Sequence, residues 1–216
     1  IVDITNPWFP MPAGSYDTPG EALGVAIYGS YILVADKEDG LKVVSVANPA
    51  APVLAGSAAV PGRSMKVAVS GTHAYVAARD SGLQVVSLAN PAAPAVVGAY
   101  KTPSEAMDVD IVGTHAYVAD KAGGLIVVNI ASPAAPVFAA AYDTPGEAMG
   151  VGADGIYACI ADAHGGLHVI YIWEPTYPTL AADVAAGYAL GVAIEDNIIA
   201  IADWENGLKV VDINNP

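Results

Sequence analysis

The stretch that decides the fold runs from Glu105 to Gly146 and reads EAMDVDIVGTHAYVADKAGGLIVVNIASPAAPVFAAAYDTPG. It divides into four short apolar runs that are separated by turn-forming residues. The predicted strands are Met107–Val112, His115–Ala119, Leu125–Ile130 and Pro136–Tyr142. No window carries the 3.6-residue apolar spacing of an amphipathic helix. We therefore expect an all-β chain.

The same unit recurs along the whole chain. The dipeptide Gly-Leu begins at residues 40, 82, 124, 166 and 207, at steps of 42, 42, 42 and 41. A four-stranded unit of this length repeated in series is typical of a β-propeller blade. A solenoid is the alternative, but solenoid units this long usually carry a helix. The spacing predicts one domain over residues 1–216, a five-bladed β-propeller of four-stranded antiparallel blades.

The chain ends indicate how such a ring would close. If the strands of a blade are named a to d from the axis outward, the last repeat supplies a, b and c and ends at Ile213. The segment from Met11 to Tyr16 matches strand d. We expect this N-terminal strand to complete the last blade, which would close the ring and remove an exposed sheet edge.

One strand is left over in this scheme. Residues 1–7 read IVDITNP and residues 210–216 read VVDINNP, so five of the seven positions are identical. One blade cannot hold two strands c. One copy is frayed, or one copy pairs with the open edge of a neighbouring molecule, or the chain is cut from a longer array of blades. Pairing with a neighbour would give an assembly role to Ile1, Val2, Ile4, Val210, Val211 and Ile213.

The outer strands also favour association. They read VLAG from Val53, AVVGAY from Ala95 and VFAAAY from Val137, without a lysine. Strands with one face in water usually alternate polar and apolar residues, and long apolar edges are usually avoided. Copies of the same chain are therefore the expected partners, unless these alanine-rich strands are simply tolerated.

Charge and composition exclude other partners. The chain has 22 acidic and 8 basic residues and a net charge of -14, which repels phosphate backbones and anionic lipids. Residues 43–60 and 125–142 are uncharged, but each stretch contains two prolines and makes a poor membrane-spanning helix. We expect neither nucleic-acid binding nor membrane insertion.

Cys159 is the single cysteine, so no internal disulfide can form. It lies in a predicted strand b, where we expect it to be a buried packing residue.

The entrance to strand a is the candidate ligand site, because it should face the axial opening. Its residues are Glu21, Arg63, Glu105, Glu147 and Tyr188, with Lys66 and Asp108 three positions further along two of the strands. Such a mouth concentrates cations and basic ligands, and we consider a pocket for a cation, a peptide or a carbohydrate. The alternative is that Arg63 and Lys66 only compensate the surrounding carboxylates.

Metal and catalytic sites find little support in the sequence. Asp36, Asp120, Asp162 and Asp203 recur four residues before each glycine, where we expect them to cap backbone N–H groups of the turn between strands b and c. The nearest calcium-like stretch is only Asp36–Gly40. His164 and His168 are four apart on a turn and a strand, which does not align them as ligands. We predict no catalytic residues, no metal and no cofactor.

The pattern A-Y-V-A-D-x-x-x-G-L-x-V-V-x-I-x-x-P at residues 116–133, with variants at 31–49, 73–91 and 199–216, resembles the LVIVD repeat. That family consists of bacterial and archaeal surface or secreted β-propellers, so the resemblance implies an extracellular or cell-surface location. With the leftover strand and the apolar rim, it leads us to expect a non-enzymatic structural propeller that self-associates into a polymer or surface layer. A binding module that uses the acidic face is the alternative.

Overall fold

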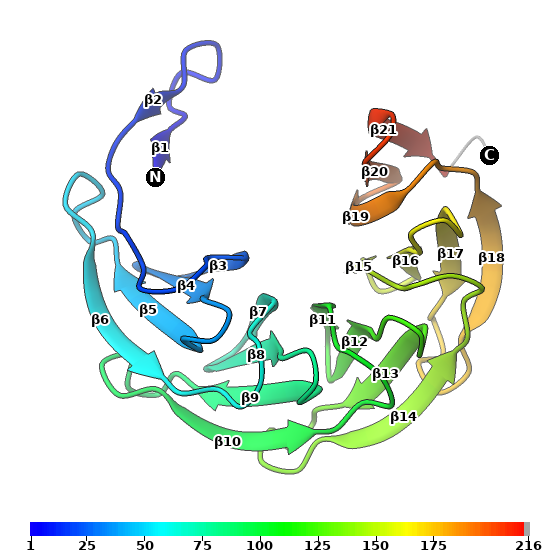
Figure 1. Cartoon of the computed structure of the whole chain (residues 1–216), viewed down its shortest axis with the longest axis horizontal. Coiled ribbons are helices and arrows are strands. Elements are labelled where there is room, and N and C mark those ends of the chain that lie inside the picture. The colour runs from blue at the N-terminus through cyan, green and yellow to red at the C-terminus, as the bar shows by residue number, and fades with distance from the viewer. Residues whose placement is uncertain (214–216) are drawn as a thin grey trace.

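The computed structural model describes residues 1–213, and every regular element in this range is a β-strand. A two-stranded hairpin is followed by four four-stranded sheets and one three-stranded sheet, all antiparallel. Figure 1 shows the sheets side by side along an arc, with the first strand of each at the inner edge and the last at the rim. The all-β, β-propeller-like prediction is therefore confirmed. The described residues form no helix that could cross a membrane.

The hairpin consists of β1 (Val2–Asp3) and β2 (Met11–Pro12). We call the following sheets blades 1 to 5 and keep the names a to d for their strands in chain order. Blade 1 contains β3 (Gly24–Tyr28), β4 (Tyr31–Ala35), β5 (Leu41–Ser45) and β6 (Val53–Ala58). Blade 2 contains β7 (Lys66–Ser70), β8 (His73–Ala77), β9 (Leu83–Ser87) and β10 (Ala95–Tyr100). Blade 3 contains β11 (Asp108–Val112), β12 (His115–Ala119), β13 (Leu125–Asn129) and β14 (Val137–Tyr142). Blade 4 contains β15 (Gly150–Ala153), β16 (Tyr157–Ala161), β17 (Leu167–Tyr171) and β18 (Thr179–Val184). Blade 5 contains β19 (Ala189–Glu195), β20 (Ile198–Asp203) and β21 (Gly207–Asp212).

The predicted strand bounds of blade 3 agree with the structure to within one residue at each end. The bounds agree because each strand ends at a turn, and the turn is formed by residues that are unfavourable within strands. Gly113 adopts a positive φ of 57° between β11 and β12, a conformation that glycine reaches without steric cost. Val112 and His115 then face each other across the turn.

The core lies between consecutive blades. Leu33, Leu41 and Val43 of blade 1 pack against residues such as Val76 and Val86 of blade 2. The same arrangement recurs at the three following blade pairs. We call the side of a blade that faces the next one along the chain its leading face, and the opposite side its trailing face. Each blade therefore needs two neighbours to bury both of its faces.

Backbone hydrogen bonds join each blade to the next. Lys37, which follows strand b of blade 1, exchanges two hydrogen bonds with Ser64 at the entrance to blade 2, with N···O distances of 3.2 and 2.9 Å. Arg79, Lys121 and Ala163 make the same two-bond bridge at the next three junctions. All four residues have φ between 42° and 48°, a left-handed conformation that is uncommon outside glycine. Its repetition at every junction indicates that the bridge holds it in place.

The chain ends do not meet as expected. Pro12 pairs with Val2 and Met11 pairs with Asp3, so β2 lies beside β1 and not beside β21. The hairpin stands at one end of the arc and β21 at the other (Figure 1). The described residues thus form an open arc, and the expected closure by residues 11–16 is not observed. Part of the second copy of the repeated segment, residues 214–216, lies outside the described residues.

Candidate functional site

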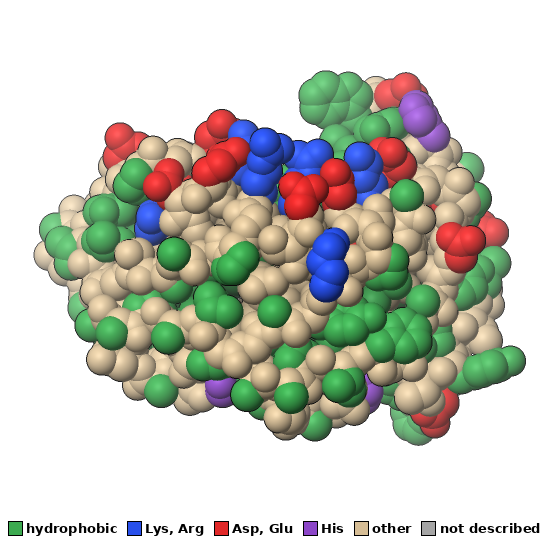
Figure 2. Space-filling view, turned by 60° about the horizontal axis from the view of Figure 1, so that its bottom comes forward, with side chains coloured by type: hydrophobic (Ala, Val, Ile, Leu, Met, Phe, Trp, Pro, Cys, Tyr) green, Lys and Arg blue, Asp and Glu red, His purple; other side chains and the backbone are tan. Residues whose placement is uncertain are grey.

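Charged side chains gather along one edge of the molecule, where the loops between strands b and c meet the loops that enter strand a. Figure 2 shows acidic and basic side chains interspersed along this edge, above a rim with few charges. Acidic and basic side chains are therefore mixed along this edge, which is not purely acidic. The predicted channel-mouth residues divide into paired groups when their contacts are followed one by one.

Glu105 is at the centre of the strongest pairing. Arg79 binds it through Nε at 3.0 Å and through Nη2 at 3.3 Å, and Lys121 Nζ lies 3.4 Å away. The hydrogen bond from Arg79 holds the pKa of Glu105 below its ordinary value. Lys121 also lies 3.9 Å from Glu147. Two of the predicted carboxylates therefore share two cations.

The other glutamates of this edge are also paired with basic side chains. Lys37 Nζ binds both oxygens of Glu21 at 2.9 Å, and Arg63 Nε lies 3.2 Å from Glu38. The basic partners Lys37, Arg79 and Lys121 escaped the sequence analysis, although they recur at steps of 42 directly after the repeated position 36, 78 and 120. This periodicity was the signal that could have revealed them. The glutamates of the predicted mouth are thus paired with Lys37, Arg79 and Lys121 and not with Arg63 and Lys66, the two residues named in the alternative of charge compensation.

Asp108 serves the inner strands of the arc. Its Oδ1 accepts a hydrogen bond from Val109 N at 2.8 Å, and its Oδ2 accepts one from Val151 N of blade 4 at 3.2 Å. Asp110 reaches Ala153 N in the same way at 2.8 Å. Burial raises the pKa of Asp108 to about 6, against the opposing effect of Lys66. Asp108 thus links the inner strands of blades 3 and 4.

Tyr188 lies apart from the charged pairs. Its ring meets the ring of His164 edge-on, with centroids 4.5 Å apart. Its backbone N–H donates to Asp203 Oδ1 at 3.1 Å. Tyr188 and Asp108 therefore contact other groups than the ion pairs of Glu21, Glu105 and Glu147.

The repeated aspartates bind a different loop from the one predicted. Asp162 accepts hydrogen bonds from Thr144 Oγ1 and Gly146 N, both at 2.6 Å, and these donors lie in the loop that enters strand a. Asp36 binds the equivalent Thr18 Oγ1 at 2.7 Å and Gly20 N at 3.0 Å. The capping prediction is right in kind, but the main partner is the loop 16 to 18 residues earlier. Asp203 also caps its own turn, at Glu205 N and Asn206 N.

Blade 2 lacks this threonine–aspartate pair and replaces both members together. Val60 stands at the threonine position and Ala78 at the aspartate position, and both are buried. The paired change leaves no buried aspartate without its threonine donor in blade 2, because a buried polar group without a partner is costly.

His168, which was considered from the sequence only as a metal ligand, is buried between two aspartates. Its Nδ1 lies 2.6 Å from Asp183 Oδ1 on the neighbouring strand β18, and its Nε2 lies 3.1 Å from Asp162 Oδ2. The hydrogen bond to Asp162 is the main reason why the pKa of His168 is raised above its ordinary value, with Asp183 adding to it. Register places residues 168 and 183 opposite each other, so the pair could have been found once the strands were aligned.

Cys159 is buried as predicted, and burial raises the pKa of its thiol to about 12. Within residues 1–213, no three histidine, cysteine, aspartate or glutamate side chains come together in a group that could hold a metal ion.

The predicted assembly residues near the C-terminus lie on both faces of blade 5. Val211 of β21 and Ile213, which follows this strand, pack against blade 4, whereas Val210 lies on the leading face of blade 5 and is 58% exposed. Leu208, which is on the same face but not among the predicted assembly residues, is 72% exposed. In blades 1 to 4 the residues at this leucine position are fully buried: Leu41, Leu83, Leu125 and Leu167.

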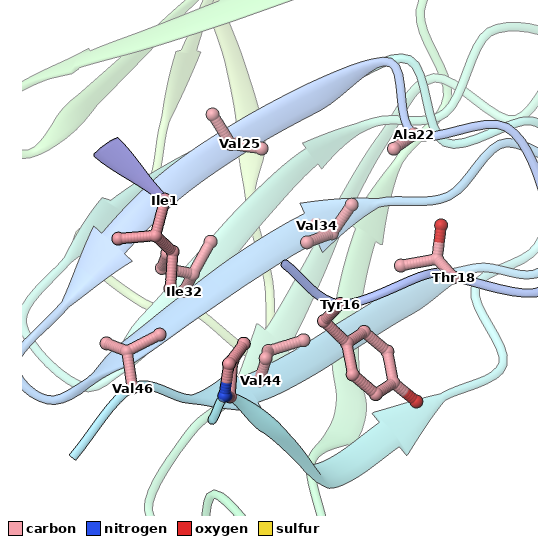
Figure 3. A pocket seen from close by; sticks show the side chains of 10 residues that line it. Ile1, Tyr16, Thr18, Ala22, Val25, Ile32, Val34, Val44 and Val46 are labelled. Atoms are coloured by element: carbon pink, nitrogen blue, oxygen red, sulfur yellow. The ribbon is translucent and has the colours of Figure 1, made fainter. Parts of the chain in front are cut away.

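The trailing face of blade 1 is open at the other end of the arc. Val25 and Ile27 are 70% and 79% exposed, although the equivalent residues of blade 2, Val67 and Val69, are packed against blade 1. Figure 3 shows a cavity on this face, with Ile1 of the hairpin beside Ile32 and the ring of Tyr16 at its edge. The hairpin therefore covers only part of a surface that elsewhere meets a whole blade.

The apolar rim is also present. The first residues of the outer strands are about half exposed in blades 1 and 3, where Val53, Leu54, Val137 and Phe138 project from β6 and β14.

Comparisons with known proteins agree with the repeat organisation. The family model described as the LVIVD repeat matches six times and covers the whole chain, at residues 1–18, 19–60, 61–102, 103–144, 145–185 and 186–216. The search of curated proteins found no match. Among solved structures, the chain is similar to the crystal structure of the computationally designed Ika8 protein, with a TM-score of 0.70 and 13% sequence identity. The similarity covers 89% of this chain and 58% of that chain, and it concerns the fold alone.

Proposed function

The chain belongs to the LVIVD-repeat family, and on this premise we propose that it is a non-enzymatic structural protein whose copies join end to end into a polymer or layer. We propose further that it acts outside the cell or at the cell surface, as the family resemblance implies. The observation that carries the proposal is the pair of open, apolar faces at the two ends of the arc. They are the leading face of blade 5 and the trailing face of blade 1.

These two faces are of the kinds that pack together inside the chain. At every internal junction, leading-face residues at the positions of Leu208 and Val210 lie against trailing-face residues at the positions of Val25 and Ile32. The leading face of one copy can therefore pack against the trailing face of another through the same residue positions that form the internal junctions. Such a head-to-tail interface uses different patches on the two partners, so it continues into a filament or a larger ring.

Burial of these side chains supplies the driving force. Complete burial of an exposed leucine or valine side chain contributes roughly 1.5–3 kcal/mol. Leu208, Val210, Val25 and Ile27 all stand at positions that are covered at other junctions. In the joined state, a, b and c of blade 5 combine with the N-terminal segment of the partner to give a fifth complete blade.

The rim offers lateral contacts in addition. Val53, Leu54, Val137 and Phe138 lie on the outer strands of separate blades and stay exposed when the ends are joined. We assign them to contacts between neighbouring filaments, because apolar patches of this kind commonly mark interaction surfaces.

The test is to measure the mass of the purified chain by light scattering over a range of concentrations and to image it by electron microscopy. We expect elongated species that grow with concentration. The double variant Leu208→Glu and Val210→Glu should give only single copies, because the open face of blade 5 would carry two charges. The matched control Leu54→Glu, on the rim, should keep the elongated species. Wild-type chain that remains a compact single copy at every concentration would refute the proposal, including the case in which each copy closes into its own five-bladed ring.

A further inference from the structure

We propose that the ends join by exchange of a strand, in which β21 of one copy takes the place of β1 beside the N-terminal segment of a second copy. This inference rests on the proposed self-association and specifies the joint, by which we mean the contact between the C-terminal end of one copy and the N-terminal end of the next. In it, β1 is a stand-in that occupies the position of strand c until a partner arrives.

The segment that follows β1 is already seated as a strand d. Gly14 lies so close to Pro49 O that a Cβ atom on it would be 2.2 Å away. Gly56 and Gly98, which are the equivalent residues of blades 1 and 2, approach Pro91 O and Pro133 O in the same way. Residues 11–16 are therefore docked on blade 1 as the outer strand of a preceding blade whose strands a and b are missing.

β1 stands at the position of strand c in this incomplete blade. Ala13 N donates to Ile1 O at 3.0 Å, and the N-terminal ammonium of Ile1 donates to Gly14 O at 2.7 Å. By repeat position, Ile1 corresponds to Val210 and Val2 corresponds to Val211. Exchange of β21 for β1 thus replaces each side chain by one of the same or nearly the same shape.

The two copies of strand c differ in how firmly they are held. β1 forms two residue pairs with β2, and its Val2 is 56% exposed. β21 forms six residue pairs with β20, and Val211 packs against blade 4. Because β1 loses fewer contacts on leaving, β1 is the strand that is displaced and β21 is the strand that stays.

The internal blades fix the register of the joint. In blade 1, Lys42 pairs with Ser57, Val43 with Gly56 and Val44 with Leu54, while Ala55 forms a bulge. Translated by the repeat, Lys209 pairs with Ser15, Val210 with Gly14 and Val211 with Pro12, and Ala13 forms the bulge. At the equivalent pair of blade 4, the side chains of His168 and Asp183 touch across the two strands, so side chains at this pair are within reach of each other.

The loop between β1 and β2 supplies an independent indication. Trp8 and Phe9 are 86% and 74% exposed, and alanines stand at both positions in blades 1, 2 and 3. At internal junctions this loop lies beside the outer strand of the preceding blade, as Ala92 does beside Gly56. In the joined state Trp8 and Phe9 therefore lie beside β18 of the other copy, where Leu180 is also exposed.

The test is disulfide cross-linking of the full chain, in which Cys159 is buried and out of reach. The double variant Lys209→Cys and Ser15→Cys carries the matched pair, and Lys209→Cys with Asp17→Cys is the control that is shifted along the strand. We expect a ladder of covalent oligomers on a non-reducing gel from the matched pair and much less from the control.

The outcomes separate the joint from the proposed function. A chain that self-associates in light scattering but gives no ladder from the matched pair, or an equal ladder from the control, would overturn the strand exchange and leave the self-association standing. A cross-link confined within single copies, or a chain that does not associate at all, would overturn both.

The contact of Trp8 and Phe9 with the other copy is tested with the double variant Trp8→Ala and Phe9→Ala, which should weaken association.

A deletion tests the stand-in role directly. Removal of residues 1–4 takes away β1 and leaves β2 free for the incoming strand. We expect association at about tenfold lower concentration, which corresponds to about 1.4 kcal/mol. Weaker association after the deletion would overturn the stand-in role and make β1 the strand that is donated.

Discussion

Thr144 Oγ1 donates a hydrogen bond of 2.6 Å to Asp162 Oδ1, although the two residues are 18 positions apart and both are buried. The bond ties the loop that enters blade 4 to the turn between its strands b and c. Its counterpart in blade 2 is the apolar pair Val60 and Ala78. Blade 5 instead combines Ala185 with Asp203, and there the carboxylate binds Gly187 N and its own turn.

Replacement of Thr144 alone and of Asp162 alone should lower the free energy of unfolding by more in total than replacement of both residues together. We expect Asp162→Ala to lower the free energy of unfolding by about 3 kcal/mol, because it leaves the Thr144 hydroxyl and Gly146 N–H without an acceptor. Thr144→Val should cost about 1 kcal/mol. Urea unfolding of the double variant should give a loss smaller than the sum of the two single losses. Strictly additive losses would contradict this coupling.

The pKa of His168 is raised in the folded chain, so the folded state binds its proton more tightly than the unfolded state. Its contribution to stability is present below the unfolded pKa of about 6.5 and is lost as the pH rises through the folded value. We expect the free energy of unfolding to fall across this range in the wild type and to fall less in His168→Gln. His73→Gln is the matched control on a strand and should retain the wild-type dependence. Identical pH profiles for the wild type and His168→Gln would rule this out.

Asp108 should titrate at an unusually high pH. Its pKa of about 6 in the folded chain exceeds the unfolded value of about 3.9. Its protonated form stabilises the fold below the lower value, and this stabilisation is lost as the pH rises to about 6. Carbon NMR of the aspartate carboxyl groups should show a transition near pH 6 that disappears in Asp108→Asn and persists in Asp110→Asn. A transition that survives in Asp108→Asn belongs to another group.

Gly146 should resist substitution while Gly191 tolerates it. A Cβ atom on Gly146 would lie 2.4 Å from Asp162 O, whereas one on Gly191 would have Ala202 Cβ as its nearest neighbour at 3.7 Å. We expect Gly146→Ala to lower the free energy of unfolding by about 1–3 kcal/mol and Gly191→Ala to change it by less than about 1 kcal/mol. Thermal unfolding compares the two, and equal effects would show that the close approach at Gly146 relaxes without cost.

We expect no cation binding at the predicted mouth, because its carboxylates Glu21, Glu105 and Glu147 are paired with Lys37, Arg79 and Lys121. Calorimetric titration with calcium should give no saturable heat. If saturable binding is observed and the double variant Glu105→Gln and Glu147→Gln abolishes it, the mouth is a ligand site and charge compensation is the wrong interpretation.

The strands could be predicted because their limits are set locally, by glycine and proline turns that recur every 42 residues. The capping residues and His168 were harder, because each contact joins positions that only the strand register brings together. Asp162, for example, lies beside Thr144 and His168 at once. The open arc could not be predicted. The angle between blades depends on how side chains such as Leu41 pack against the next sheet, and the repeat length carries no information on that angle.

The left-handed bridges at Lys37, Arg79, Lys121 and Ala163 are made by main-chain atoms alone. Lysine, arginine and alanine all serve, so these positions can accept new side chains over evolution without loosening the junction. If a gene gained or lost one 42-residue segment, the same main-chain bridge would form at the new junction. The length of the protein is therefore free to change by whole repeats.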